Sequence, residues 1–195
     1  MKKVIFMLLP AFVLLLCSCG FNNNDNAGLK SGDVTIDSFL EVTKADFATE
    51  LKKSNKAVFY ESMITFVNTV DEDPGNIERV TNIVQDTSMC IQFVHQGGNT
   101  YITKNPSWWL RGLPINLDSI ISLDSAIIRL QQANIQKPKS RYCVLRYDSC
   151  PTQITPAYIF GPDSTRFVRV DGLTGDVSER LNNAKKQTLV FREEI

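Results

Sequence analysis

The sequence predicts an α+β domain in which an antiparallel sheet packs against one or two helices. Several segments rich in β-branched and aromatic residues are separated by short turns that contain glycine, asparagine or aspartate. Two stretches are predicted to be helices from the spacing of their apolar residues, and each precedes a group of strand-like segments. Hydrophobic residues make up 43% of the 195 residues and charged residues 22%, a balance that is sufficient for a hydrophobic core.

Residues 1–18 have the pattern of a lipoprotein signal peptide. Lys2 and Lys3 form a positive tip, and the apolar run 4–16 is too short for a membrane-spanning helix. The tetrad Leu16-Cys17-Ser18-Cys19 resembles the bacterial lipobox, which implies that Cys19 is acylated and becomes the first residue of the mature chain. We therefore expect a lipid anchor in a membrane of the bacterial cell envelope, with the protein facing the periplasm or the exterior. Ordinary secretion and an uncleaved anchor are the alternatives.

A flexible tether is expected over residues 19–34, because this segment is rich in asparagine, glycine and aspartate and has little to bury. The folded domain then occupies residues 35–195. The formal net charge of the whole chain is zero, and no basic block or stripe occurs. This distribution of charge argues against nucleic acid as a partner.

The first half of the domain is predicted to begin with a short strand at 35–40. Thr43-Lys44-Ala45-Asp46 has the form of a helix start, which predicts a short helix over about 44–54. Residues 57–67 predict a central strand, since apolar residues occur on both sides. One face would hold Val58, Tyr60, Ile64 and Phe66, and the other Phe59, Met63 and Val67.

Two further segments complete the predicted first half. Residues 77–86 fit both a helix and a strand, and their β-branched side chains favour the strand. Residues 88–103 predict a hairpin whose turn is 96–99, where Gly97 and Gly98 can adopt positive φ. His95 lies beside this turn and is the single histidine of the chain. We interpret it as a satisfied or exposed strand residue rather than as a ligand or base.

The second half is predicted to begin with the clearest helix, over residues 122–134. Ser122 is a suitable N-cap, and Leu123, Ile127 and Leu130 form an apolar stripe. The predicted strands that follow are 142–147, 156–160 and 167–170, an extended piece from residue 177, and an edge strand at 188–191.

The C-terminal third contains a distinctive turn motif. The segment Val170-Asp171-Gly172-Leu173-Thr174-Gly175-Asp176-Val177 closes the last two of three strands that follow a helix, and residues 122–177 together resemble the PepSY-like domains of bacterial envelope proteins. Asp171 and Thr174 can bond backbone amides within the turn, and Gly175 can adopt positive φ, so the motif is structural. The spacing of Asp171 and Asp176 does not match an EF-hand, so no metal site is expected. Residues 36–113 show a similar order of helix and strands, without a residue-level match.

That resemblance implies a non-enzymatic module that binds or inhibits peptidases. We therefore expect a membrane-anchored binding module whose partner is an envelope protein. A sensor of small ligands or glycans is the alternative, and it would use the loop that contains Trp108 and Trp109, because tryptophan is enriched at binding hot spots. A purely structural interpretation is also open, in which one of the two tryptophans is buried and the other packs on a loop.

Catalysis and cofactors are not expected. The sequence lacks the common nucleophile, phosphate-loop and zinc motifs, and a catalytic cysteine would have only His95 as its base. A hydrolase is therefore the least favoured hypothesis. Cys143 and Cys150 are close enough in sequence for a disulfide if the chain turns between them, which the envelope would permit. Cys90 would then be a free, buried thiol.

Overall fold

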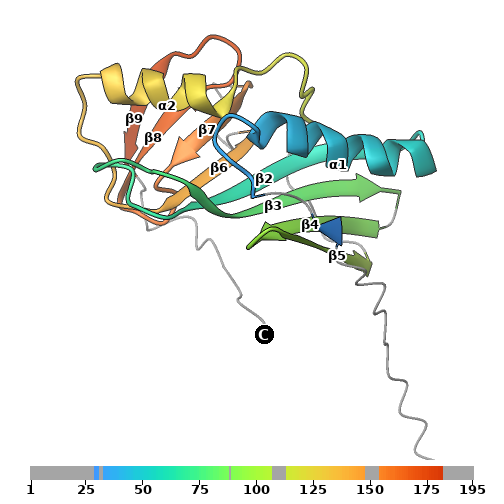
Figure 1. The fold of residues 1–195 in the computed structure, drawn as a ribbon. Helices are drawn as coiled ribbons and strands as arrows, with labels where there is room; N and C mark the ends of the chain where they lie inside the picture. Colours follow the sequence, from blue (N-terminus) through green and yellow to red (C-terminus); the bar gives the residue numbers. More distant parts are fainter. Residues whose placement is uncertain (1–28, 31–32, 88, 107–112, 148–153, 182–195) are drawn as a thin grey trace, which may run out of the picture.

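The computed structural model describes residues 29–30, 33–87, 89–106, 113–147 and 154–181. Within this part of the chain, each half has one helix followed by four strands (Figure 1). A two-residue strand precedes them. The elements are β1 (Leu29–Lys30), α1 (Phe39–Lys53), β2 (Val58–Phe66), β3 (Ile77–Asp86), β4 (Met89–Gln96), β5 (Asn99–Pro106), α2 (Leu123–Gln132), β6 (Tyr142–Tyr147), β7 (Pro156–Phe160), β8 (Arg166–Asp171) and β9 (Val177–Leu181).

All of these strands join one antiparallel sheet with the order β1-β5-β4-β3-β2-β6-β7-β8-β9. The first long strand of each half, β2 or β6, lies at the centre, and the two pair with each other. From this central pair, the later strands of each half follow outward in chain order. The predicted α+β class with an antiparallel sheet and two helices is confirmed, although the sheet dominates the fold.

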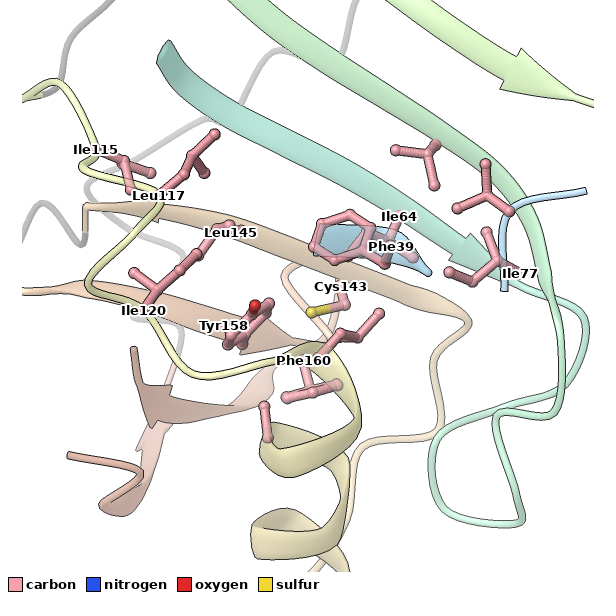
Figure 2. Packing of buried hydrophobic residues seen from close by; sticks show 14 of the residues in the cluster. Phe39, Ile64, Ile77, Ile115, Leu117, Ile120, Cys143, Leu145, Tyr158 and Phe160 are labelled. Carbon is pink, nitrogen blue, oxygen red and sulfur yellow. The ribbon is translucent and has the colours of Figure 1, made fainter. Parts of the chain in front are cut away.

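Both helices lie on the same face of the sheet (Figure 1). The core fills the space between them and the strands, and Figure 2 shows Phe39, Ile64, Cys143, Tyr158 and Phe160 within it. The ring of Phe39, at the start of α1, makes an edge contact with Tyr158 of β7 at 6.5 Å between centroids. One core therefore joins the two halves. No described helix is long and apolar enough to cross a membrane.

The start of the domain differs from the prediction. Residues 36–38 form a turn instead of a strand, and α1 begins at Phe39. Thr43, the expected cap, is buried inside the helix, where its hydroxyl donates to Asn82 Oδ1 at 3.3 Å. The Thr35 amide instead donates to Ser38 Oγ at 2.9 Å and closes the turn before the helix. Thr43 therefore serves a contact with a distant strand and does not cap the helix.

The predicted faces of β2 hold for Met63, Ile64 and Phe66 but are wrong at the start of the strand, because the strand contains a bulge. Its pairing with β3 shifts between Phe59 and Glu61. The shift brings Phe59 onto the same face as Ile64 and Phe66, and all three are buried in the core. Strict alternation assigned Phe59 to the opposite face.

Other predictions are confirmed. Residues 77–86 form a strand, and the turn between β4 and β5 has Gly97 at φ 57° and Gly98 at φ 70°. The Ser122 side chain caps α2 by accepting the Ser125 amide at 3.1 Å. The strands β6 and β7 have the predicted bounds. The predicted edge strand at 188–191 lies outside the described residues.

Candidate functional site

The candidate site is the face of the sheet that α1 and α2 do not cover, here called the open face. Side chains alternate along a strand, so residues next to core positions point to the open face. One row of paired residues crosses the open face from β5 to β9. Its members are Tyr101, Val94, Thr81, Met63, Val144, Ile159, Arg169 and Ser178.

The part of the open face formed by β2–β5, with Tyr142 of β6 at its border, is here called the exposed part. It is exposed along its margins, although Thr81 and Ile83 of β3 are buried at its centre. Tyr101 is 43% exposed and Tyr142 is 48% exposed, and Val67 at the end of β2 is 51% exposed. Arg79 of β3 is exposed and is paired in register with Thr65, which in turn is paired with Tyr142. Aromatic and arginine side chains are the types that dominate binding energy at protein interfaces.

One exposed arginine, Arg79, gives this exposed part a local positive charge. Glu61 of β2 and Arg146 of β6 form an ion pair at 3.8 Å across the centre of the sheet. Burial raises the pKa of Glu61, and the charge of Arg146 partly opposes this effect. Because Glu61 is matched by Arg146, the exposed Arg79 leaves a local excess of positive charge.

The part of the open face formed by β6–β8 is buried instead. Val144, Ala157, Ile159 and Arg169 are each less than 5% exposed. The guanidinium of Arg169 donates to Thr155 Oγ1 at 2.5 Å and to Asp171 Oδ2 at 3.0 Å. A charged side chain is thus held inside an apolar patch by a carboxylate and a hydroxyl.

The turn after β8 has the structural role that its motif predicts. Asp171 Oδ1 accepts the amides of Leu173 at 2.8 Å and Thr174 at 3.1 Å. Thr174 Oγ1 accepts the amide of Asp176 at 3.2 Å, and Gly175 has φ 77°. The predicted amide contacts and the positive φ of Gly175 are therefore confirmed.

The same contacts control the ionisation of Asp171. Burial alone would raise its pKa, but the Thr155 hydroxyl, the two turn amides and Arg169 together outweigh burial. The pKa of Asp171 is lowered to about 2. These groups all donate to the carboxylate, so they favour its charged form.

A second group of polar residues is buried on the helix face, between α1 and the sheet. Asp46 Oδ2 contacts His95 Nε2 at 2.7 Å and accepts from Asn82 Nδ2 at 2.6 Å. Ser62 donates to Asn82 Oδ1 at 2.5 Å, and Thr100 Oγ1 contacts His95 Nδ1 at 2.9 Å. Both ring nitrogens of His95 therefore have hydrogen-bond partners, and the side chain is buried. Of the two predicted alternatives, a satisfied or an exposed strand residue, the first is confirmed.

Thr100, His95 and Asp46 contact one another in the hydroxyl–imidazole–carboxylate order of hydrolytic triads. His95 is nevertheless only 5% exposed, and the cavity that it helps to line has a volume of about 20 Å³. That volume is enough for a water molecule and too small for an organic substrate. The contacts of this network are suited to fixing α1 on the sheet.

Sequence reasoning did not find the buried polar network. Asp46 was placed in a helix start and His95 in a strand end, and their contact spans a sequence separation of 49 residues. A signal was present, since Thr43, Asp46 and Glu50 recur at helical spacing where a core-facing helix usually carries apolar residues. A polar inner face requires polar partners on the sheet.

The remaining predicted site residues are only partly visible. Cys19, Trp108, Trp109 and Cys150 lie outside the described residues. Cys143 is a free, fully buried cysteine in the core, so the described half of the pair gives the predicted bridge to Cys150 no support. Cys90 is also free and buried.

Within the described ranges, no group of three or more histidine, cysteine or acidic residues could hold a metal ion. The chain matches no protein family model, and neither a curated protein nor a solved structure matches it.

Proposed function

We propose that the protein is a lipid-anchored lipoprotein of the bacterial envelope that binds another envelope protein without catalysing a reaction. The exposed part of the open face is the contact surface. A single observation carries this proposal: both helices pack on one face of the sheet, and the opposite face carries exposed Tyr101, Tyr142, Val67 and Arg79. A solvated sheet face is ordinarily polar, and the exposed tyrosines and valine on this face support its use as a contact surface.

The chemistry of this face favours a protein surface with apolar and acidic groups. Tyr101 and Tyr142 provide flat, rigid contact area, and Arg79 provides a charge that a carboxylate can pair with. The PepSY-like resemblance of residues 122–177 supports a partner of the peptidase class, which the module would inhibit by covering it.

The N-terminal pattern supports the location. Acylated Cys19 would hold the domain at a membrane, and the tether over residues 19–34 would let the open face reach a neighbouring protein. A binding module gains from this arrangement because tethering raises the effective concentration of its partner.

The test is affinity capture of the full-length protein from its own envelope after chemical crosslinking. We expect Arg79→Glu and Tyr101→Ala to reduce recovery of one specific partner at least tenfold, or about 1.4 kcal/mol, because hot-spot residues carry most of the binding energy. Lys104→Glu is the matched control, since Lys104 is exposed on the same hairpin but lies at a helix-face position. Mass spectrometry of the captured protein should show an acylated N-terminal Cys19.

Two results would contradict the proposal. Equal recovery of the partner by the Arg79, Tyr101 and Lys104 variants would exclude the open face as the contact surface. An unmodified N-terminus, or one that begins elsewhere than at Cys19, would remove the lipid anchor.

A further inference from the structure

The outer edge of β5 is free along most of its length. In the order of the strands, its described neighbour on that side is β1, which has only two residues. Leu29 is paired with Thr100 and Lys30 with Asn99. Among the described residues, none is paired with this edge from Tyr101 to Pro106. The edge of a sheet presents backbone N–H and C=O groups to which another strand can bond.

The hairpin of β4 and β5 determines which backbone groups face this edge. Its turn consists of Gly97 and Gly98, with φ angles of 57° and 70°, and the flanking residues Gln96 and Asn99 are paired. Residues that flank such a two-residue turn exchange both of their backbone hydrogen bonds. Along an antiparallel strand, residues that bond to the partner alternate with residues whose backbone groups point the other way. The backbone of Asn99 therefore faces β4, and so does that of every second residue after it.

Ile102 and Lys104 consequently direct their N–H and C=O groups away from β4, toward the free edge. The pairing of Thr100 with Leu29 agrees with this alternation, because the backbone of Thr100 also faces outward. Pro106 is the next residue in the series, and it offers a carbonyl group without an N–H. The free edge therefore offers donors and acceptors in the arrangement that an antiparallel strand can bond, and this arrangement ends at Pro106.

The side chain of Tyr101 gives this edge a chemical preference. Tyr101 lies on the open face and is 43% exposed. Because its backbone bonds to β4, an added strand would meet Tyr101 at a non-hydrogen-bonded position, where directly opposed side chains approach most closely. Pairs of aromatic residues, or of an aromatic and a β-branched residue, stabilise a sheet at such positions. An added strand is therefore expected to carry an aromatic or β-branched residue opposite Tyr101.

We propose that the partner protein adds an extended segment to the free edge of β5, antiparallel to β5, with an aromatic or β-branched residue opposite Tyr101. This inference rests on the proposed function and specifies how the partner engages the exposed part of the open face. Backbone hydrogen bonds to Ile102 and Lys104 would supply affinity, and the contact with Tyr101 would supply specificity.

Two described features support this occupant. The strand β1 already pairs with Asn99 and Thr100 in the antiparallel sense, so the same edge accepts an extended segment in that direction. Lys104 is exposed on β5, and a lysine on an edge strand disfavours pairing between identical edges. The side chain of Lys104 thus favours a segment of a different protein over a second copy of this chain, while its backbone remains available.

The test is hydrogen exchange of the full-length protein in detergent micelles, read at individual amides by nuclear magnetic resonance. Without a ligand, the amides of Ile102 and Lys104 should exchange at least tenfold faster than those of Tyr101 and Thr103, because only the latter bond to β4. The probe is a peptide of alternating tyrosine and glutamine with blocked ends. At millimolar concentration, it should slow exchange at Ile102 and Lys104 several-fold.

A modified peptide and two protein variants isolate the backbone contacts. The same peptide with N-methyl groups on the backbone amides of its glutamines keeps its side chains but cannot donate to β5, so it should leave exchange unchanged. Lys104→Pro removes an outward N–H and should abolish the effect of the unmodified peptide at Ile102, since proline is tolerated where the N–H of an edge strand faces solvent. Lys104→Glu keeps the amide and should respond as the wild type does. A melting temperature equal to that of the wild type shows that each variant is folded.

Slow exchange of Ile102 and Lys104 in the free protein would overturn the proposal, because the edge would then already be paired, within the chain or between copies. Equal slowing by the N-methylated peptide, or no slowing by either peptide, would overturn it as well. The proposed function stands in these cases if capture of the partner still depends on Arg79 and Tyr101. If capture depends on neither residue while the peptide slows exchange, the proposed function fails and the binding of an extended segment to β5 stands.

Discussion

The two halves of the molecule share one order of elements but hold their helices by different physical means. The helix α1 buries Phe39, Thr43, Asp46 and Glu50, of which three are polar or charged. The buried side chains of α2 are all apolar: Leu123, Ala126, Ile127 and Leu130. The inner face of α1 thus combines a buried polar network with apolar contacts, such as the ring of Phe47 on Phe59, whereas the buried face of α2 is entirely apolar.

The strand residues under each helix match the polarity of its buried face. Beneath α1, Ser62 and Asn82 lie where apolar residues would be expected, and they join the network of Asp46. The residues paired next in register beneath α2 are instead the mainly apolar Leu145 and Tyr158. A polar interior is stable only when every group is paired, whereas an apolar interior loses stability in proportion to the volume removed. The two halves should therefore respond differently to truncation.

The largest effect is expected from Asp46→Ala in the α1 half. The substitution leaves Asn82 Nδ2 and His95 Nε2 buried without their shared partner, Asp46 Oδ2. Each buried polar group that is left without a partner costs about 1–3 kcal/mol, so the loss of both contacts should lower the unfolding free energy by about 2–6 kcal/mol. Urea unfolding measures this loss. Asp37→Ala, at an exposed position just before α1, is the control and should change stability by less than about 0.5 kcal/mol. A similar loss in both variants would contradict a structural role for the network.

A somewhat smaller effect is expected from Leu130→Ala in the α2 half. Leu130 is fully buried, so truncation leaves a cavity and removes contact with the core. The expected loss is about 2–4 kcal/mol, reduced where the surrounding side chains relax into the space. Ile128→Ala is the control, because Ile128 is on the same helix and 46% exposed. If Leu130→Ala lowers the unfolding free energy no more than Ile128→Ala does, apolar packing does not hold α2 on the sheet.

The smallest effect, and one that depends on pH, is expected at the turn after β8. Asp171→Asn should cost about 1–3 kcal/mol at neutral pH, because it removes a charged acceptor of several hydrogen bonds. The folded pKa of about 2 lies below the ordinary aspartate value of 3.8, so the carboxylate stabilises the folded state fully only above about pH 4. This stabilisation is lost as the pH falls toward 2.

Urea unfolding at several pH values between 7 and 2 checks this prediction. The difference in stability between the wild type and Asp171→Asn should be largest at neutral pH and should shrink below pH 4. A difference that is independent of pH would show that the charge of Asp171 does not contribute. No corresponding carboxylate network is present in the turn between β4 and β5, where Gly97 and Gly98 alone supply the positive φ angles.

The sequence was informative wherever structure depends on neighbours along the chain. The helix α2 was predicted to within two residues at either end, because its cap and its apolar stripe are both local. The helix α1 was predicted to start five residues too late, because its inner face is polar and its periodicity does not stand out. The bulge in β2 likewise places Phe59 on the core face, opposite to the face that strict alternation predicted for it.

The candidate site was accessible to sequence reasoning only in part. The sequence drew attention to Trp108 and Trp109, whereas the described open face depends on Tyr101, Tyr142 and Arg79. These three residues are ordinary members of separate strands, and nothing in their local sequence brings them together. They form one surface because β5, β3 and β6 lie in one sheet with both helices on the opposite side.

Local sequence is sufficient for the turns, the cap of α2, most strands and the lipobox-like tetrad that ends at Cys19. Hydrogen bonds within a few residues and the φ angles open to glycine are sufficient for such features. The order of the strands, the pairing of Asp46 with His95 and the exposure of each part of the open face follow instead from the packing of the whole domain. These features depend on contacts between residues far apart in the chain, which no local pattern specifies.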